Sequence, residues 1–290
     1  MCIDWAHGAA KVTRVGTPTT AYGHTCLAYD DPAVLDARAV RFLAAGLAVG
    51  ERVGLIATGS RDELTGRLAG LPGLDDALRR GAVQLMSVEQ MYRFDAIVDP
   101  DAQVRAYAAA TDEALAAGHT GLRVVADATP LVRTAAQRVA FARYEHLIDR
   151  FMRHRPMSAI CAYDRRVLGD AAIDELACLH PEGNTGVLFQ LHALAGKEPV
   201  ALRGELDPSN HAQFAAALDR ADPRPVDGRL LLDATGLRFV DHRSLLHLRD
   251  HARRHGATAV LRTSRAATAR LVELLELAEI EVEVAVGGAR

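Results

Sequence analysis

The sequence is short of cysteine, of aromatic residues and of an excess of charge of either sign. Its cysteines are too few and too widely spaced for a disulfide scaffold, which predicts reduced thiols at Cys2, Cys26, Cys161 and Cys178. With 34 basic and 37 acidic residues the formal net charge is −3, so we expect neither nucleic acid nor an anionic membrane surface as a partner. No signal-peptide pattern and no run of ~20 apolar residues is present, which predicts a cytoplasmic protein.

The 290 residues, 49% of them hydrophobic, are enough for two folded domains. Residues 1–20 show no apolar periodicity, and we expect a flexible lead-in there. A segment rich in turn formers begins at His180 and interrupts the pattern of the chain. We therefore predict a first domain over residues 21–185, a linker over 186–195 and a second domain over 196–290.

In the first domain, apolar runs alternate with segments of helical periodicity. Strands that are apolar throughout and separated by helices are typical of a mostly parallel sheet covered on both faces. The predicted strands are residues 24–30, 51–59, 82–88, 121–128 and 157–164, and the predicted helices are 32–47, 61–71, 100–117 and 135–154.

The second domain repeats the alternation on a smaller scale and predicts a sheet of four or five strands. Asp207, Ser209 or Asn210 is expected to cap its first helix. The predicted strands are residues 199–206, 228–237, 258–263 and 281–286, and the predicted helices are 209–221, 243–255 and 266–278.

Residues 196–290 resemble a STAS domain of the anti-sigma-factor-antagonist type. The resemblance is based on the segments 204–207 and 230–248 and on the closing alternation of the chain. It implies binding of a partner protein such as an anti-sigma factor through Asp207, Asp241, His242, Arg243 and Ser244. Arg243 stands where the family has a phosphorylated serine, so the usual phosphoswitch is expected to be lost. Ser244 is interpreted as a polar residue of the first helical turn.

The first domain resembles the MEDS domain, a RecA-like sensory module, which implies an α/β fold and a small-molecule ligand of unnamed identity. The segment 58–63, after the second strand, has one glycine, no Lys-Ser/Thr pair and two carboxylates, which argues against a Walker-type nucleotide site. The resemblance is based on His24, Gly46, Gly50, residues 121–127, 143–151 and 160–164, and His180–Pro181.

Ligands of open α/β sheets bind at the carboxyl ends of the strands. The residues predicted to line a ligand pocket are Tyr29, Asp30, Asp127, Tyr163 and Asp164, together with His24, Glu145 and His180. Two interpretations of Glu145 remain open: a contact with His24 or His180 beneath the sheet, or an ion pair with Arg143 or Arg150 on the helix surface.

Two pairs of residues, His24 with Cys26 and Cys178 with His180, have the spacing of side chains on one face of a strand. Together they suggest a tetrahedral zinc site. The interpretation we favour is that both cysteines are small buried residues and both histidines are hydrogen-bonded.

The sequence as a whole predicts a non-catalytic signalling regulator, and it leaves a homodimer open. A metal-dependent sensor or enzyme and a constitutive interaction scaffold are the alternatives.

Overall fold

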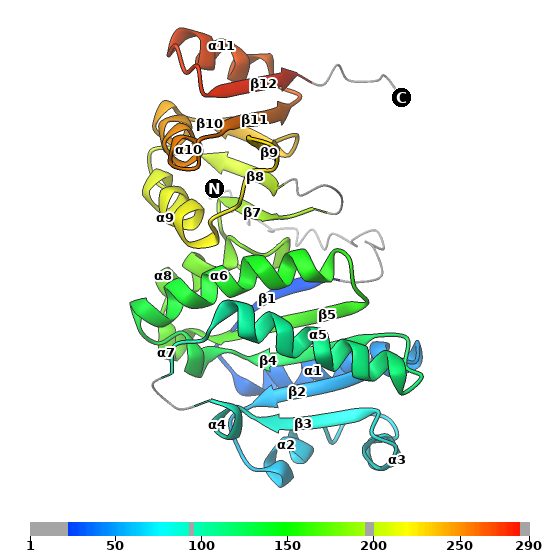
Figure 1. Ribbon diagram of the computed structural model, residues 1–290. Helices are drawn as coiled ribbons and strands as arrows, with labels where there is room; N and C mark the ends of the chain where they lie inside the picture. The colour runs from blue at the N-terminus through cyan, green and yellow to red at the C-terminus, as the bar shows by residue number, and fades with distance from the viewer. Residues whose placement is uncertain (1–22, 93–95, 195–199, 285–290) are drawn as a thin grey trace, which may run out of the picture.

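The computed structural model describes residues 23–92, 96–194 and 200–284. They form two α/β domains stacked one on the other, with the N-terminal domain in blue to green and the C-terminal domain in yellow to red (Figure 1). The predicted lead-in 1–20, part of the predicted linker and the last two residues of the predicted closing strand lie outside the described residues.

The first sheet has six parallel strands in the order β3-β2-β4-β5-β1-β6. The α/β prediction is confirmed, and the bounds of β5 agree with it residue for residue. The strands are β1 His24–Tyr29, β2 Arg52–Ala57, β3 Val83–Ser87, β4 Leu122–Asp127, β5 Met157–Asp164 and β6 Glu182–Gly183.

Helices cover both faces of this sheet. The residues of α1, α2 and α3 pack into the apolar cluster on one face, and those of α5, α6 and α8 pack into the cluster on the other. The helices are α1 Pro32–Ala48, α2 Arg61–Arg67, α3 Leu74–Arg79, α4 Val88–Met91, α5 Pro100–Ala116, α6 Ala135–Met152, α7 Arg165–Leu168 and α8 Asp170–Ala177, with a 3₁₀ turn at Thr129–Leu131.

The second sheet also has six strands, in the order β10-β8-β9-β11-β12, with β7 antiparallel to β8. The strands are β7 Phe189–Ala193, β8 Val200–Leu206, β9 Arg229–Asp233, β10 Leu237–Val240, β11 Thr258–Thr263 and β12 Ile280–Val284. The helices are α9 His211–Ala221, α10 His242–Arg254 and α11 Ala266–Leu274.

Two predictions about the second domain differ from the structure. Residues 189–193, predicted as linker, form β7, because Phe189 and Leu191 are buried in the core while the strand pairs with β8. The predicted strand 228–237 is shorter in the structure and ends as β9 at Asp233, because the Asp233 carboxylate accepts hydrogen bonds from the backbone N–H and the hydroxyl of Thr235 and forms a turn. A separate strand that was not predicted, β10, begins at Leu237 and ends at Val240.

The start of α9 also differs from its predicted cap. Asp207 accepts hydrogen bonds from Ser209, and the Asn210 side chain bonds to Asp207 N and to the Glu205 carbonyl. The helix therefore begins at His211 without a side-chain cap, and the three polar residues close the loop after β8 instead.

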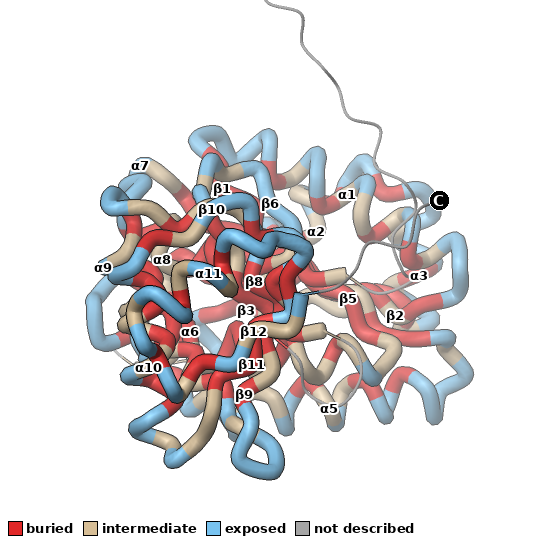
Figure 2. Tube along the Cα trace, turned by 90° about the horizontal axis from the view of Figure 1, so that it is seen from above, coloured by how far each residue is buried: buried red, intermediate tan, exposed pale blue. Residues whose placement is uncertain are grey.

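The apolar core continues from one domain into the other. Helix α6 packs against α9 and β7, and one buried cluster includes Ile148 and Met152 of α6 together with Phe189 of β7 and Phe214 of α9. Figure 2 shows buried segments running through the strands at the centre, with exposed segments on the outer helices. Among the described helices, none is long and apolar enough to cross a membrane.

Candidate functional site: a buried polar cluster beneath the first sheet

Neighbouring strands β1 and β5 present polar side chains to the face of the sheet that α6 covers. Side chains two apart on a strand share a face, and His24 and Cys26 of β1 are in register with Ala159 and Cys161 of β5. Tyr163 continues the same row on β5. The alternation of two strands therefore gathers an imidazole, two thiols and a phenol under one helix.

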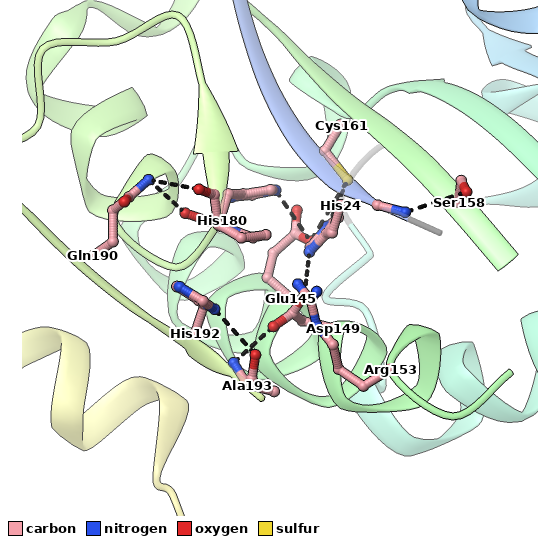
Figure 3. Close-up of polar contacts among 12 residues, drawn as sticks. His24, Glu145, Asp149, Arg153, Ser158, Cys161, His180, Gln190, His192 and Ala193 are labelled. Carbon is pink, nitrogen blue, oxygen red and sulfur yellow. Dashed lines mark hydrogen bonds and ion pairs between the residues drawn. The ribbon is translucent and has the colours of Figure 1, made fainter. Parts of the chain in front are cut away.

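Helix α6 supplies two carboxylates to this row. Glu145 and Asp149 are four residues apart, so they lie on one face of the helix, one turn from each other. Glu145 Oε2 lies 3.0 Å from His24 Nε2, and Asp149 Oδ1 lies 3.4 Å from His24 Nδ1. All three side chains have 0% of their surface exposed. The imidazole is thus held between two carboxylates in the interior of the protein (Figure 3).

Tyr163, Cys161 and His180 complete the cluster around Glu145. The Tyr163 hydroxyl donates to Glu145 Oε1 at 2.5 Å, and Cys161 Sγ lies 3.5 Å from Glu145 Oε2 and 3.5 Å from His24 Nε2. His180 lies beside His24 with the rings tilted by 41° and their centroids 4.1 Å apart, and its Nε2 lies 3.6 Å from Glu145 Oε2.

The His180 ring is fixed from its other side. Its Nδ1 lies 3.0 Å from the Leu176 carbonyl, an acceptor, so Nδ1 is the protonated nitrogen. Its Nε2 is then a lone-pair acceptor, and this buried atom has no hydrogen-bond partner. The nitrogen is therefore available to a donor group or a metal ion.

The carboxylates determine the charge of the cluster. Burial opposes a charge on His24, but hydrogen bonds and charges from Asp149 and Glu145 outweigh it and raise the pKa of His24 to about 9. Burial and the neighbouring charge of His24 lower the pKa of His180 to about 4. Burial and the charge of Glu145 raise the pKa of the Cys161 thiol well above its usual value. At neutral pH, His24 is therefore an imidazolium, and His180 and Cys161 are neutral.

The cluster is bonded directly to strand β7 of the second domain. Asp149 Oδ2 accepts a hydrogen bond of 2.7 Å from the backbone N–H of Ala193, while Asp149 Oδ1 pairs with Arg153 at 2.9 Å. The Gln190 side chain donates to the carbonyl of His180 at 3.0 Å. Both histidines of the cluster are thus connected to the same strand of the second sheet.

A cavity of about 400 Å³ lies beside the cluster, where the first sheet meets the second domain. His24 and Arg153 line it from the first domain, and His192 and Arg203 line it from β7 and β8. The cavity gives solvent and small solutes an approach to the edge of the buried cluster.

The residues predicted to line a ligand pocket fall into two groups. His24, Glu145, Tyr163 and His180 meet in the buried cluster. The other four, Tyr29, Asp30, Asp127 and Asp164, lie at the carboxyl ends of their strands.

At those strand ends the polar groups are engaged with one another. The Tyr29 hydroxyl donates to Asp127 at 2.9 Å, Asp164 pairs with Arg166 at 2.7 Å, and Asp30 lies 3.8 Å from Arg165.

The structure does not bring together the four residues of the predicted zinc site. Cys178 lies at the C-terminal cap of α8, not on a strand, and its thiol donates to the Glu175 carbonyl. The side chains that converge on His24 and His180 are Glu145 and Cys161, with their ligand atoms all within 4.8 Å of one another.

Asp149 and Cys161 are the functional candidates that the sequence analysis missed. Both have a signal in the sequence. Asp149 is one helical turn from Glu145, on the same face of the helix, and Cys161 alternates in phase with Tyr163 on a strand. The contact of Cys161 with His24 depends on the pairing of β1 with β5. The two residues are 137 positions apart in the chain, so local spacing does not predict this contact.

The predicted partner-binding residues differ in exposure. Asp241 caps α10 by accepting from the Ser244 backbone N–H at 2.8 Å, and both side chains are buried. His242 and Arg243 are exposed on the first turn of α10, and Asp207 is half-buried at the end of β8. The surface available to a partner thus consists of the exposed pair and Asp207.

Comparison with known families agrees with this division of the molecule. The structure divides the chain into a larger α/β domain that contains the buried cluster and a smaller α/β domain. The family described as "MEthanogen/methylotroph, DcmR Sensory domain" (MEDS) matches residues 23–181, and the family described as "Mlab, STAS domain" matches residues 192–283. The chain belongs to the MEDS family and has a C-terminal STAS domain, which makes it a signalling or regulatory protein. No curated protein matches the sequence.

Proposed function

We propose that this chain is a non-catalytic signal-transduction protein whose buried cluster responds to a small ligand and whose STAS domain binds a regulatory protein such as an anti-sigma factor. The observation that supports it most is the double contact of Asp149, which pairs with His24 on one side and binds the Ala193 N–H of β7 on the other. A change in the cluster therefore acts directly on a strand of the STAS sheet.

The route from β7 to the partner surface is short. Strand β7 pairs with β8 along five residues, and β8 pairs with β10. Asp207 follows β8, and Asp241, which begins α10, follows β10. A shift of β7 would therefore displace both segments that hold the exposed partner-binding residues. Such a shift follows ligand binding only if the ligand has different affinities for the two arrangements.

The loop after β2 supports the non-catalytic assignment. In a phosphate-binding loop the backbone N–H groups at this place are free to bind the phosphates. Here Gly59 N–H donates to Glu89, and Ser60 N–H donates to Glu63, which also completes the capping box of α2. Carboxylates occupy the donors that a nucleotide would need.

Binding to purified anti-sigma factors of the source organism tests the proposal. We expect Arg243→Glu to weaken binding by about tenfold or more, equivalent to about 1.4 kcal/mol, by reversing an exposed charge on α10. Arg79→Glu is the matched control, because Arg79 is an exposed arginine on α3 of the first domain, outside the STAS domain.

The coupling is tested in the same assay with Asp149→Asn, whose matched control is Asp112→Asn on the exposed side of α5. We expect the first variant to change partner affinity and the second to leave it unchanged. Binding that is strong but identical in all of these variants would support a constitutive scaffold and contradict the proposal.

A further inference from the structure

We propose that the buried cluster is a tetrahedral site for Zn²⁺ or a similar divalent transition metal, with His24 Nε2, Glu145 Oε2, Cys161 Sγ and His180 Nε2 as its ligands. The inference deepens the proposed function and rests on it in one respect: metal occupancy acts as a signal only if the cluster is coupled to the STAS domain. The site itself rests on the geometry that follows.

The distances between the ligand atoms fit one ion. Zinc bonds of about 2.0–2.3 Å in a tetrahedron place the ligand atoms about 3.3–3.8 Å from one another. In the cluster, Glu145 Oε2 lies 3.0 Å from His24 Nε2, 3.5 Å from Cys161 Sγ and 3.6 Å from His180 Nε2. Cys161 Sγ lies 3.5 Å from His24 Nε2. The two remaining distances, from His180 Nε2 to His24 Nε2 and to Cys161 Sγ, are no longer than 4.8 Å. An ion among these atoms requires the 3.0 Å contact to open and His180 to adjust its position.

The groups around the ligands are those that orient a metal site. Metal-binding histidines commonly donate their other ring N–H to a carboxylate or a carbonyl. His24 Nδ1 faces Asp149, and His180 Nδ1 faces the Leu176 carbonyl. The remaining oxygen of Glu145 accepts from the Tyr163 hydroxyl. Glu145 and His180 therefore have their metal-facing atoms selected by a hydrogen bond on the other side, whereas His24 Nδ1 is oriented by a 3.4 Å ion pair with Asp149 and makes no hydrogen bond.

His180 gives the independent sign that a ligand is accommodated here. Its Nε2 is fully buried, has no hydrogen-bond partner and is directed at the other three ligand atoms. A metal ion accepts that lone pair. It also replaces the proton on His24 Nε2 and the proton on Cys161 Sγ, both of which leave to solvent, so the +2 ion is balanced by the Glu145 carboxylate and the Cys161 thiolate.

A second group of potential ligands in the described residues lacks these features. Asp222, His251 and His255 supply three ligand atoms at the edge of α10. His251 Nε2 lies 3.2 Å from the Pro223 carbonyl, and His255 Nε2 lies 2.8 Å from Asp222. Its ring nitrogens are satisfied without an ion, so the first cluster alone is proposed as a site.

The donor set selects the class of metal. Imidazole and thiolate favour zinc, cobalt and related transition metals, whereas magnesium and calcium require oxygen ligands.

The test is titration of the chelator-treated full-length protein with Co²⁺, followed by replacement with Zn²⁺ and elemental analysis. We expect one ion per chain, intense visible bands of tetrahedral cobalt, and a near-ultraviolet thiolate-to-cobalt band. Cys161→Ser should lose the thiolate band, whereas Cys26→Ser should retain it. Cys26 is a matched control because it is a buried cysteine in register with Cys161 on the neighbouring strand.

Asp149→Asn, which leaves all four ligands in place, should weaken metal binding by about 10–100-fold. An absence of stoichiometric binding, a weak octahedral cobalt spectrum, or a thiolate band lost in Cys26→Ser but kept in Cys161→Ser would overturn the assignment. The metal stoichiometry and the cobalt spectrum are measured on the wild-type protein, so these two results do not depend on whether a variant folds.

Failure of the site and failure of the proposed function are distinguishable. If no metal binds but Asp149→Asn still alters partner affinity, the metal assignment falls and the proposed function stands. If metal binds through Cys161 but neither the metal nor Asp149→Asn alters partner affinity, the site stands and the proposed coupling falls.

Discussion

The two domains have sheets that are parallel except for β7 in the second, but their interiors differ greatly. Beneath the first sheet, His24, Glu145 and Asp149 are charged groups with no exposed surface. The corresponding interior of the second domain is aliphatic, with Leu202 of β8, Leu232 of β9 and Leu261 of β11 among its buried residues. Both domains fold around parallel strands, so the fold itself does not require buried charge.

The difference agrees with the proposal that the first domain detects the signal and the second presents it. Burying charges costs free energy that pairing recovers only in part, and apolar replacements of such groups are often neutral or stabilising. An interior that keeps three buried charges has therefore retained them for a reason other than stability.

The largest effect should follow from removing the imidazole at the centre of the cluster. We expect His24→Ala to lower the free energy of unfolding by about 3–5 kcal/mol, because Glu145 is left buried without a cationic partner. The measurement is urea denaturation of the metal-free protein. His154→Ala, an exposed histidine just after α6, should change the free energy by less than about 0.5 kcal/mol. Equal effects of the two substitutions would contradict the buried-charge description.

A double substitution that removes buried charge should make the interior of the first domain more like that of the second. In His24→Leu with Glu145→Gln, the amide still accepts from Tyr163 and gains a donor toward His180 Nε2. We expect the double variant to regain about 1–3 kcal/mol of the stability lost in His24→Ala, as measured in the same denaturation assay. It should nevertheless show no response of the STAS domain to ligand. A double variant as unstable as His24→Ala would refute the view that unpaired charge is the cause.

Replacing a glycine by alanine in each sheet compares how well the two backbones tolerate an added Cβ atom. Gly204 in β8 has φ +93°, and a Cβ there would overlap the Leu188 carbonyl oxygen, whereas a Cβ on Gly54 of β2 meets only ordinary contacts. Gly204→Ala should therefore cost more than about 1 kcal/mol and loosen β7 from β8, while Gly54→Ala should be tolerated. Thermal unfolding measures the loss of stability in each variant, and hydrogen exchange of the β7 amides measures the loosening of β7. A Gly204→Ala protein with protected β7 amides would contradict this prediction.

The smallest expected change in the free energy of unfolding at neutral pH is that of substituting His192, which lies on β7 between the cores of the two domains. Burial lowers its pKa from 6.5 to about 4, although the charge of Asp149 opposes the shift. The unfolded chain therefore binds the proton first, so the stabilising contribution of neutral His192 is complete above pH 6.5 and is lost as the pH falls toward 4.

Removing this titration should flatten the pH dependence of stability. The free energy of unfolding of His192→Gln should fall less steeply than that of the wild type between pH 6.5 and 4. Urea denaturation at several pH values checks this. Parallel curves for the two proteins would show that His192 does not titrate as a buried neutral residue.

The sequence predicted the fold well where the pattern was regular. The limits of β5 and β11 were predicted correctly, because both are apolar runs bounded by turns or polar residues. Strand β7 was assigned to the linker because its five residues follow a turn-rich segment and become a strand only by pairing with β8. The break between β9 and β10 depends on a local hydrogen bond that the Thr235 hydroxyl donates to the Asp233 carboxylate. The apolar residues before it favoured a continuous strand, so the break was not predicted.

For the candidate site, the sequence identified His24, Glu145, Tyr163 and His180 but not how they meet. His24 and His180 lie at opposite ends of the domain sequence, and only the order β5-β1-β6 brings their rings together. Spacing along the chain suggested Cys26 and Cys178 as partners of the histidines. The register between β1 and β5, which spacing does not contain, places Cys161 among them instead.

Amide hydrogen exchange of the full-length protein tests the coupling of the two domains most directly. The comparison is between the wild type and His24→Gln, a change confined to the buried cluster. We predict faster exchange at Ala193, whose N–H is bound by Asp149, and at amides of β8 and β10 in the STAS sheet. Faster exchange limited to β1, β5 and α6, with β7, β8 and β10 unchanged, would contradict the claim that the cluster acts on the STAS domain.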